Sequence, residues 1–429
     1  MTPAERLYRI VEDGLCIGCG LCQSVAGPER VQVVETPAGE LRPVVVGEVD
    51  DATVERIYDV CPGVRVEGLP ESDVTPATHV DNVWGPWRRM VRAWATDPSV
   101  RFEGSAGGVL TALAIYLLET GRVSFVLHAR ASRSRPTFGE RHVSVTREDV
   151  LAGAGSRYGP AAPLIDVHQA LARGEPFAFV GKPCDVAALR NLARHDPRVH
   201  EQVRYWLAPV CGGYMPTAST GEFLRRHDVD PDEVTALRYR GRGCPGPTRI
   251  ETATRVMELD YVDLWGEDSS QWSLPFRCKV CPDGIGEAAD VAVADAWPGG
   301  APERGASEWD PGVNAVVVRT ERGRELMEAA GRDGALTFEY DVTPDEMSRY
   351  QPHQMRKKYA VWARYQGLLE EGRLAPRTER LRIRELAGEL PESFHAQQRE
   401  GTRRRVRDGR TSESTPVAAD GTGVEGGGS

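Results

Sequence analysis

The sequence has 429 residues, of which 40% are hydrophobic and 27% charged, and this balance is typical of a soluble globular protein with two or three domains. Its net charge of −10 argues against non-specific binding to nucleic acid or to an anionic membrane. No apolar run reaches the length of about 18 residues that a membrane-spanning helix needs. The first residues lack an apolar core preceded by basic residues, so we expect no secretory signal and a cytoplasmic location.

Residues 1–70 are predicted to form a small cysteine-bearing module. Two short β-type runs, 31–34 and 41–46, are separated by a turn-like Pro-Ala-Gly-Glu segment. Asp51 is expected to cap a helix that runs towards Cys61, and a further β-type run covers 64–67. Residues 71–84 are rich in Pro, Thr, Ser and Asp and are predicted to be a linker.

From residue 85 to 340 short apolar strands alternate with helical patterns, which favours an α/β or α+β domain with a mixed sheet. Helices are expected over 109–119, after a cap at Asp185, and from about Thr217. The strand candidates are 123–129, 177–180, 205–210, 291–294 and 315–319.

The C-terminal part has a different composition. Residues 341–396 are strongly charged and read as helical, whereas 397–429 are rich in Arg, Gly and Ser and are predicted to be disordered. The arginines 403–405 are interpreted as part of a solvated basic tail, with contact to a phosphate or an acidic partner as the alternative.

The N-terminal cysteines form a pattern of their own. Cys16, Cys19 and Cys22 follow one another at x2 spacing on a glycine-containing loop, and Cys61 precedes a proline. Three such thiolates with a distant Cys-Pro are the bacterial ferredoxin arrangement for a 4Fe-4S cluster. A zinc site is the alternative, although zinc favours separated Cys-x-x-Cys pairs. Free thiols and a three-ligand 3Fe-4S cluster are further alternatives, and Cys61 argues against the latter.

A second set of cysteines is more scattered. Cys184 and Cys211 each follow a predicted strand, so neighbouring strands would bring both thiols to one edge of the sheet, where ligands bind in open α/β sheets. Cys278 and Cys281 supply two more thiols at x2 spacing. On spacing alone this set predicts an iron–sulfur or a zinc site, and buried unreactive cysteines are the alternative. Cys244 either replaces one of the four or is a free thiol.

Four sequence blocks carry a family resemblance. The blocks GSAGGVLTALAIYLLETGRVSFVLHA, VGKPCDVAALRNL, APVCGGYMPT and CKVCPDGIGEAADVAVADAW occur in this order. Together they resemble the beta-subunit family of coenzyme F-420 (F420) hydrogenases and dehydrogenases, over roughly residues 80–340.

The resemblance implies a flavoprotein that binds FAD and a 4Fe-4S cluster. The family's cluster cysteines match Cys184, Cys211, Cys278 and Cys281. Some members exchange electrons with F420, and others resemble ferredoxin-dependent reductases of chlorophyll-type pigments. The N-terminal ferredoxin-like module is a departure from the plain hydrogenase subunit and implies a second 4Fe-4S cluster. Members with such a module look like reductases that take electrons from a carrier.

A glycine-rich loop is the candidate flavin cradle. Ser105, Gly107 and Gly108 precede a helix whose free N–H groups favour a pyrophosphate, although a Rossmann fingerprint is absent and an ordinary turn is the alternative. Lys182 is interpreted either as a cation beside a flavin or cluster or as an exposed loop lysine. Asp283, Asp290 and Asp295 are expected to serve as loop and cap residues, with substrate positioning as the alternative. No catalytic residue is assigned.

These features predict an iron–sulfur flavoprotein oxidoreductase that connects a one-electron carrier, such as ferredoxin, to a two-electron acceptor. Oxidoreduction of F420 is one alternative. A non-catalytic electron-transfer subunit that needs a partner oxidoreductase subunit is another, and a zinc-stabilised binding protein is a third. The sequence names no substrate.

Overall fold

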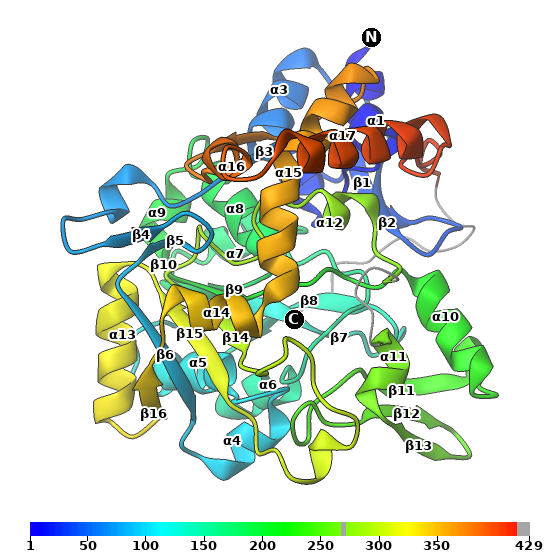
Figure 1. Ribbon diagram of the computed structural model, residues 1–429. Helices are drawn as coiled ribbons and strands as arrows, with labels where there is room; N and C mark the ends of the chain where they lie inside the picture. The colour runs from blue at the N-terminus through cyan, green and yellow to red at the C-terminus, as the bar shows by residue number, and fades with distance from the viewer. Residues whose placement is uncertain (267–271, 418–429) are drawn as a thin grey trace.

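The computed structural model describes residues 1–266 and 272–417 (Figure 1). Its N-terminal module contains helices α1 (Pro3–Glu12), α2 (Leu21–Ala26) and α3 (Asp51–Val60) and strands β1 (Val31–Glu35), β2 (Leu41–Val45) and β3 (Arg65–Glu67). Strands β1 and β2 pair antiparallel, as the turn between them predicts. The cap of α3 is Asp50 and not Asp51, because the Asp50 carboxylate accepts the Thr53 N–H at 2.7 Å.

A mixed eight-stranded sheet forms the centre of the protein and confirms the predicted α/β (α+β) class. Its strands, from edge to edge, are β16 (Leu336–Asp341), β6 (Arg89–Ala95), β15 (Asn314–Val318), β14 (Val291–Asp295), β10 (Val203–Pro209), β9 (Phe177–Val180), β7 (Phe125–Ala131) and β8 (Gly139–Ser144). The four strands β14, β10, β9 and β7 run parallel, and the outer strands pair antiparallel. Near-continuous apolar runs such as β14 and β15 arise because both faces of the sheet are covered.

Helices cover the two faces of this sheet. One face packs against α4 (Pro98–Glu103), α5 (Val109–Glu119) and α13 (Glu321–Arg332), with Leu113 and Leu326 in the shared core. The other face packs against α7 (Val167–Ala172), α8 (Pro183–Leu192) and α9 (Arg198–Gln202). Helix α6 (Arg147–Ala152) follows β8.

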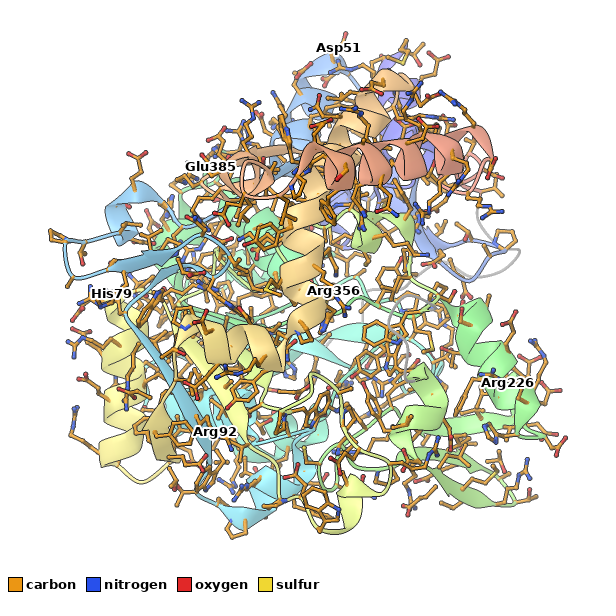
Figure 2. The ribbon with its side chains drawn as sticks, in the orientation of Figure 1. Asp51, His79, Arg92, Arg226, Arg356 and Glu385 are labelled. Atoms are coloured by element: carbon orange, nitrogen blue, oxygen red, sulfur yellow. The ribbon has the colours of Figure 1, made fainter. Side chains whose placement is uncertain are left out.

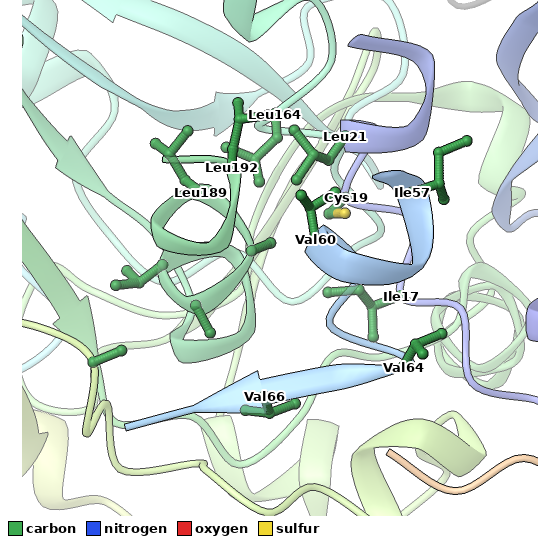
Figure 3. Close-up of a cluster of buried hydrophobic side chains, with 14 of the residues drawn as sticks. Ile17, Cys19, Leu21, Ile57, Val60, Val64, Val66, Leu164, Leu189 and Leu192 are labelled. Atoms are coloured by element: carbon green, nitrogen blue, oxygen red, sulfur yellow. The ribbon is translucent and has the colours of Figure 1, made fainter. Parts of the chain in front are cut away.

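The N-terminal module shares one hydrophobic core with the second face of the sheet. Cys19, Leu21 and Val60 of the module lie in the same buried cluster as Leu189 and Leu192 of α8 (Figure 3). The loop that carries the first cysteines is therefore fixed against the larger domain by burial of apolar surface. Residues 71–84, which connect the N-terminal module to the larger domain, contain the 3₁₀ turn η1 (Glu71–Asp73) and strand β4 (His79–Asp81). Strand β4 pairs with β5 (Gly85–Trp87).

A smaller three-stranded sheet stands beside the main one. It contains β11 (Val234–Arg238), β12 (Thr248–Thr252) and β13 (Val256–Leu259), with helices α10 (Thr217–Arg226) and α11 (Tyr261–Trp265) next to it and the 3₁₀ turn η2 (Pro231–Glu233) before it. Helix α12 (Phe276–Lys279) and the 3₁₀ turn η4 (Ala306–Glu308) lie in the connections around β14.

The C-terminal segment is ordered well beyond the predicted point. It forms α14 (Pro344–Tyr350), α15 (Pro352–Glu370), β17 (Arg377–Glu379), α16 (Ile383–Ala387) and α17 (Glu392–Arg407). The predicted disorder is therefore wrong for residues 397–417, because α17 packs on α15 closely enough that a Cβ at Gly367 would lie 2.6 Å from the Arg399 carbonyl oxygen. Residues 418–429 lie outside the described part.

The C-terminal segment also joins the N-terminal module. Strand β17 pairs parallel with β3, and α15 and α17 lie beside the module in Figure 1. Within the described residues, no helix has the length and apolar character needed to cross a membrane.

Candidate functional site

The first cysteine set lines one small cavity. Cys16, Cys19, Cys22 and Cys61 all contribute to its wall, together with apolar side chains of α1 and α3 such as Ile10 and Val60. The loop reaches this geometry through left-handed glycines, with φ of 68° at Gly18 and 87° at Gly20. The Gly18 N–H donates to the Cys16 sulfur at 3.4 Å. Two chain segments that are distant in sequence thus present four thiols to one space.

Burial raises the pKa of each thiol in this set, to about 12 for Cys61. In such surroundings a thiolate is stable only when a cation compensates its charge. Four buried sulfurs around one apolar cavity are therefore a donor set whose chemistry suits an iron–sulfur cluster.

The second cysteine set lines another cavity at the carboxyl ends of the parallel strands. Cys184 lies in the first turn of α8, directly after β9, and Cys211 follows β10, the parallel neighbour of β9. Cys278 of α12 and Cys281 complete the wall. The Cys211 N–H donates to the Gly284 carbonyl oxygen at 2.7 Å, which joins the end of β10 to the loop after Cys281. Burial raises the pKa of Cys184 and raises that of Cys211 to about 12.

Cys244 belongs to neither cavity. It is buried, with 1% of its surface exposed, and it lies in the loop between β11 and β12. The two groups of four therefore assemble without it.

The part of the chain that the structure describes contains no ready-made site for a single metal ion, because no group of three or more His, Cys, Asp or Glu side chains there is placed to hold one. An assignment of cysteine-bound clusters therefore rests on the shared cavities and on the chemistry of four thiols.

A much larger cavity, of about 400 Å³, lies beside the second cysteine set. It is open at the carboxyl ends of β9, β10 and β14, the edge where ligands bind in open α/β sheets. Lys182, Cys211 and Gly213 line both this large cavity and the second cysteine cavity. Ile17 lines both cysteine cavities. The three cavities thus follow one another through the protein.

The predicted glycine-rich cradle contributes to the large cavity only in part. Ser105 and Gly108 line it, whereas Gly107 faces the sheet, where a Cβ would lie 2.8 Å from the Asn314 side-chain oxygen. The Val109 N–H, the first of α5, donates to that same Asn314 oxygen at 3.1 Å. This donor is therefore already used inside the protein, and the remaining polar groups at this wall come from Ser105 and its neighbours.

Lys182 is a part-buried residue and not an exposed loop lysine. Its ammonium donates to the Asp185 carboxylate at 2.6 Å, and 22% of the side chain is exposed. Burial acts to lower its pKa, but Asp185 and the neighbouring Cys184 outweigh burial, and the pKa is raised. The expected cap at Asp185 is wrong: α8 begins with Pro183 after Lys182, and Asp185 is buried as the partner of that lysine.

An ion pair that the sequence patterns did not predict lines the large cavity. Arg240 donates to Asp295 at 2.8 Å and also to the Ser105 carbonyl oxygen. Its guanidinium lies 4.8 Å from the centre of the Trp297 ring. The Arg240 Nε is buried and has no hydrogen-bond partner among the described residues. No local pattern could have revealed this pair, because its members are 55 residues apart.

The same wall is rich in aromatic rings. Those that line the cavity are Tyr158, Tyr261, Trp265, Trp272 and Trp297. Lined by these rings, the glycine loop and the buried Arg240, this space fits a flat aromatic cofactor or substrate with polar substituents. Asp283 and Asp290, in contrast, bind backbone N–H groups of Ile285 and Trp206, in agreement with loop roles.

The fold and the site define an α/β protein with a large ligand cavity next to two four-cysteine cavities. Residues 90–169 match the family model "Coenzyme F420 hydrogenase/dehydrogenase, beta subunit N-term", and residues 174–342 match the model for the C-terminal part of the same beta subunit. The chain belongs to the coenzyme F420 hydrogenase/dehydrogenase beta-subunit family, a family of oxidoreductases, which confirms the resemblance.

Individual relatives are distant. The chain is 24% identical to the coenzyme F420-dependent sulfite reductase of Methanocaldococcus jannaschii over 76% of its own length and 47% of the relative's. It is 26% identical to F420-dependent formate dehydrogenase 1 subunit beta of Methanococcus maripaludis, over 57% of its own length and 60% of the relative's. The chain thus spans about half of these two relatives.

A solved structure supports the fold. A chain of the F420-reducing [NiFe] hydrogenase complex from Methanosarcina barkeri matches with a TM-score of 0.51 and 22% identity, over 65% of this chain and 92% of that chain.

Proposed function

We propose that the chain is an FAD- and iron–sulfur-dependent oxidoreductase that connects a one-electron carrier to a two-electron acceptor. Cys16, Cys19, Cys22 and Cys61 would hold one 4Fe-4S cluster, and Cys184, Cys211, Cys278 and Cys281 a second. The isoalloxazine and pyrophosphate of FAD would occupy the large cavity, beside Ser105, Gly108 and Lys182. Clusters supply one-electron chemistry, and a bound flavin exchanges one electron or a hydride.

The observation that carries the proposal is the consecutive order of the three cavities. The first cysteine cavity shares Ile17 with the second, and the second shares Lys182, Cys211 and Gly213 with the large cavity. Lys182 would place a positive charge between the second cysteine set and the flavin, where it stabilises added negative charge. Arg240, whose Nε has no hydrogen-bond partner among the described residues, would orient a polar edge of the ligand.

Coenzyme F420 is the candidate for the two-electron partner, because several relatives are named as F420-dependent enzymes or F420 hydrogenase subunits. The family also includes hydrogenase and dehydrogenase subunits, so a partner oxidoreductase subunit is the second candidate function. In that case the purified chain alone would not turn over.

Anaerobic purification with iron, sulfide, zinc and flavin quantified tests the assignment. We expect about eight iron atoms and one FAD per chain. C19S and C281S should each remove about four irons, and C244S, a buried cysteine outside both cavities, should remove none.

Other results of the metal and flavin analysis would each contradict a specific part of the proposal. Zinc without iron would identify a zinc-stabilised binding protein, and iron without flavin would overturn the two-electron role. If C19S and C281S removed the same iron, the two sets would not be separate. Assays with F420 and with reduced ferredoxin then show which partner reacts, and absence of turnover with both favours a subunit of a larger complex.

A further inference from the structure

A group of five cations near the second cysteine set has no acidic partner among the described residues. Most arginines of this acidic chain form ion pairs, and on α17 itself Arg403 and Arg407 both pair with Glu371. The five cations of this group, called the basic patch, are Lys279, Arg356, Lys357, Arg364 and Arg405. They come from α12, α15 and α17, which adjoin in Figure 1.

A hydrogen bond joins two of the elements that carry the basic patch. The Arg364 guanidinium donates to the Lys279 carbonyl oxygen at 2.5 Å, which fixes α15 against α12. Burial, and after it the charge of Arg405, lowers the pKa of Arg364 to about 10, so Arg405 of α17 lies close to it. Positions 356, 357 and 364 share one face of α15 and span about 12 Å along its axis. Arg356, labelled in Figure 2, is exposed at the other end of the patch.

The patch adjoins the second cysteine cavity. Lys357 lines that cavity and donates to the Gly212 carbonyl oxygen at 3.3 Å. Lys279 stands between Cys278 and Cys281 in sequence and is exposed. A protein bound over these cations would therefore sit directly outside the second cysteine set.

The first cysteine set has a different surface next to it. Helix α3, which leads into Cys61, carries Asp51 and Glu55 with exposed fractions of 77% and 64%. Only Arg6 pairs with these two carboxylates among the described residues. An acidic carrier would be repelled there and attracted to the basic patch.

We propose that the basic patch is the docking surface for a small acidic redox protein of the ferredoxin type. The inference rests on the proposed function, because it assumes that the second cysteine set holds a cluster. It places the entry point for electrons at this set and not at the N-terminal module. Each encounter removes one electron from the carrier and adds one to the chain, so two encounters supply a two-electron acceptor. Arg356, Arg364 and Arg405 lie outside the segment that the family models match.

The test uses the purified holoprotein and an acidic bacterial ferredoxin, with binding measured by calorimetry at several salt concentrations. The variant R356E/R405E reverses two exposed cations of the patch. We expect its Kd to be at least tenfold weaker than that of the wild type, and its salt dependence to be smaller. The matched control R225E/R226E makes the same charge change on α10, and Figure 2 shows Arg226 well apart from Arg356; this control should leave Kd unchanged.

Reduction rates give a second measurement. Ferredoxin should reduce R356E/R405E more slowly, whereas reduced methyl viologen, a small radical monocation that needs no docking surface, should reduce it at the wild-type rate. Equal Kd values for wild type and R356E/R405E, or equal weakening in the control, would overturn the docking surface. Iron content is measured in parallel: a chain without iron that still binds ferredoxin through Arg356 and Arg405 contradicts the proposed function but not the surface.

Discussion

The guanidinium of Arg277 donates two hydrogen bonds, at 3.1 and 2.7 Å, to the carbonyl oxygen of Pro62. Pro62 follows Cys61 of the first cysteine set, and Arg277 precedes Cys278 of the second. Arg277 is 1% exposed, and although burial acts to lower its pKa, Cys281 and other neighbours keep that pKa raised. One buried cation therefore joins the two cysteine sets across 215 positions of sequence.

Replacing Arg277 by Met should cost about 2 kcal/mol of unfolding free energy, because the Pro62 carbonyl would be buried without a donor. We also expect iron to be lost more readily on dialysis, since both cysteine segments lose a common anchor. Urea unfolding and iron content check this. R404M, at an exposed arginine of α17, is the control and should stay within about 0.5 kcal/mol of wild type. An R277M protein as stable as R404M would contradict the anchoring role.

Replacing Gly18 by a larger residue should destabilise the protein more than its left-handed backbone angle alone explains, because the space around Gly18 is also crowded. Gly18 and Gly121 have nearly the same left-handed φ, 68° and 65°. A Cβ at Gly18 would lie 2.6 Å from the Leu41 carbonyl oxygen, whereas a Cβ at Gly121 has nothing within 4 Å. G121A should therefore show only the conformational cost of about 1 kcal/mol. G18A should cost at least about 1 kcal/mol more and lower the iron content.

Both glycine variants are compared by chemical unfolding under anaerobic conditions. Equal free energies of unfolding for G18A and G121A would show that the loop can move away from β2. The close packing of the cysteine loop on that strand would then have no energetic importance.

The C-terminal segment should stabilise the N-terminal module through one ion pair. Arg42 is 1% exposed and donates to the two carboxylate oxygens of Glu413 at 2.6 and 2.8 Å. E413Q leaves Arg42 with Glu40, 3.5 Å away, as its acidic neighbour, so we expect a loss of about 2 kcal/mol. E392Q removes a surface pair with Arg399 and should change stability by less than about 0.5 kcal/mol.

Thermal unfolding of both variants at one pH decides this prediction. A larger shift for E392Q than for E413Q would mean that the contact between the C-terminal segment and β2 contributes little.

His128 should make the protein less stable in mild acid. It is buried beside the large cavity, its Nε2 lies 2.7 Å from the Ser144 hydroxyl, and burial followed by His142 lowers its pKa to about 4. The unfolded chain takes up the proton near pH 6.5, before the folded chain does, so stability is full above that pH and falls as pH drops towards 4. Between pH 7 and pH 5 this residue alone should cost about 2 kcal/mol.

The pH effect is measured as the difference between wild type and H128Q in urea unfolding at pH 7 and pH 5. Other groups contribute equally to both proteins, so H128Q should lose about 2 kcal/mol less than wild type over this interval. Equal losses would show that folding does not lower the pKa of His128, so that it is protonated in the folded protein at pH 5.

Local sequence patterns were enough to predict the bounds of most helices and strands that position the site. Helix α5 and strand β9 have the predicted bounds, and β1, β2, β10, β14 and β15 lie within one or two residues of them. Apolar periodicity and glycine positions decide such elements because they depend on neighbours within one or two turns of the chain. The spacing of Cys16, Cys19 and Cys22 likewise needs only one loop.

Contacts between residues that are distant in sequence could be seen only in the tertiary structure. Cys184 and Cys211 meet Cys278 and Cys281 because β9 and β10 are parallel neighbours and α12 packs at their ends. Arg240 forms an ion pair with Asp295, 55 residues further along the chain. Helix α17 is ordered by packing on α15, although its composition resembles that of a disordered tail. Long-range pairs of this kind follow from packing free energy summed over the whole chain, which no short stretch of sequence contains.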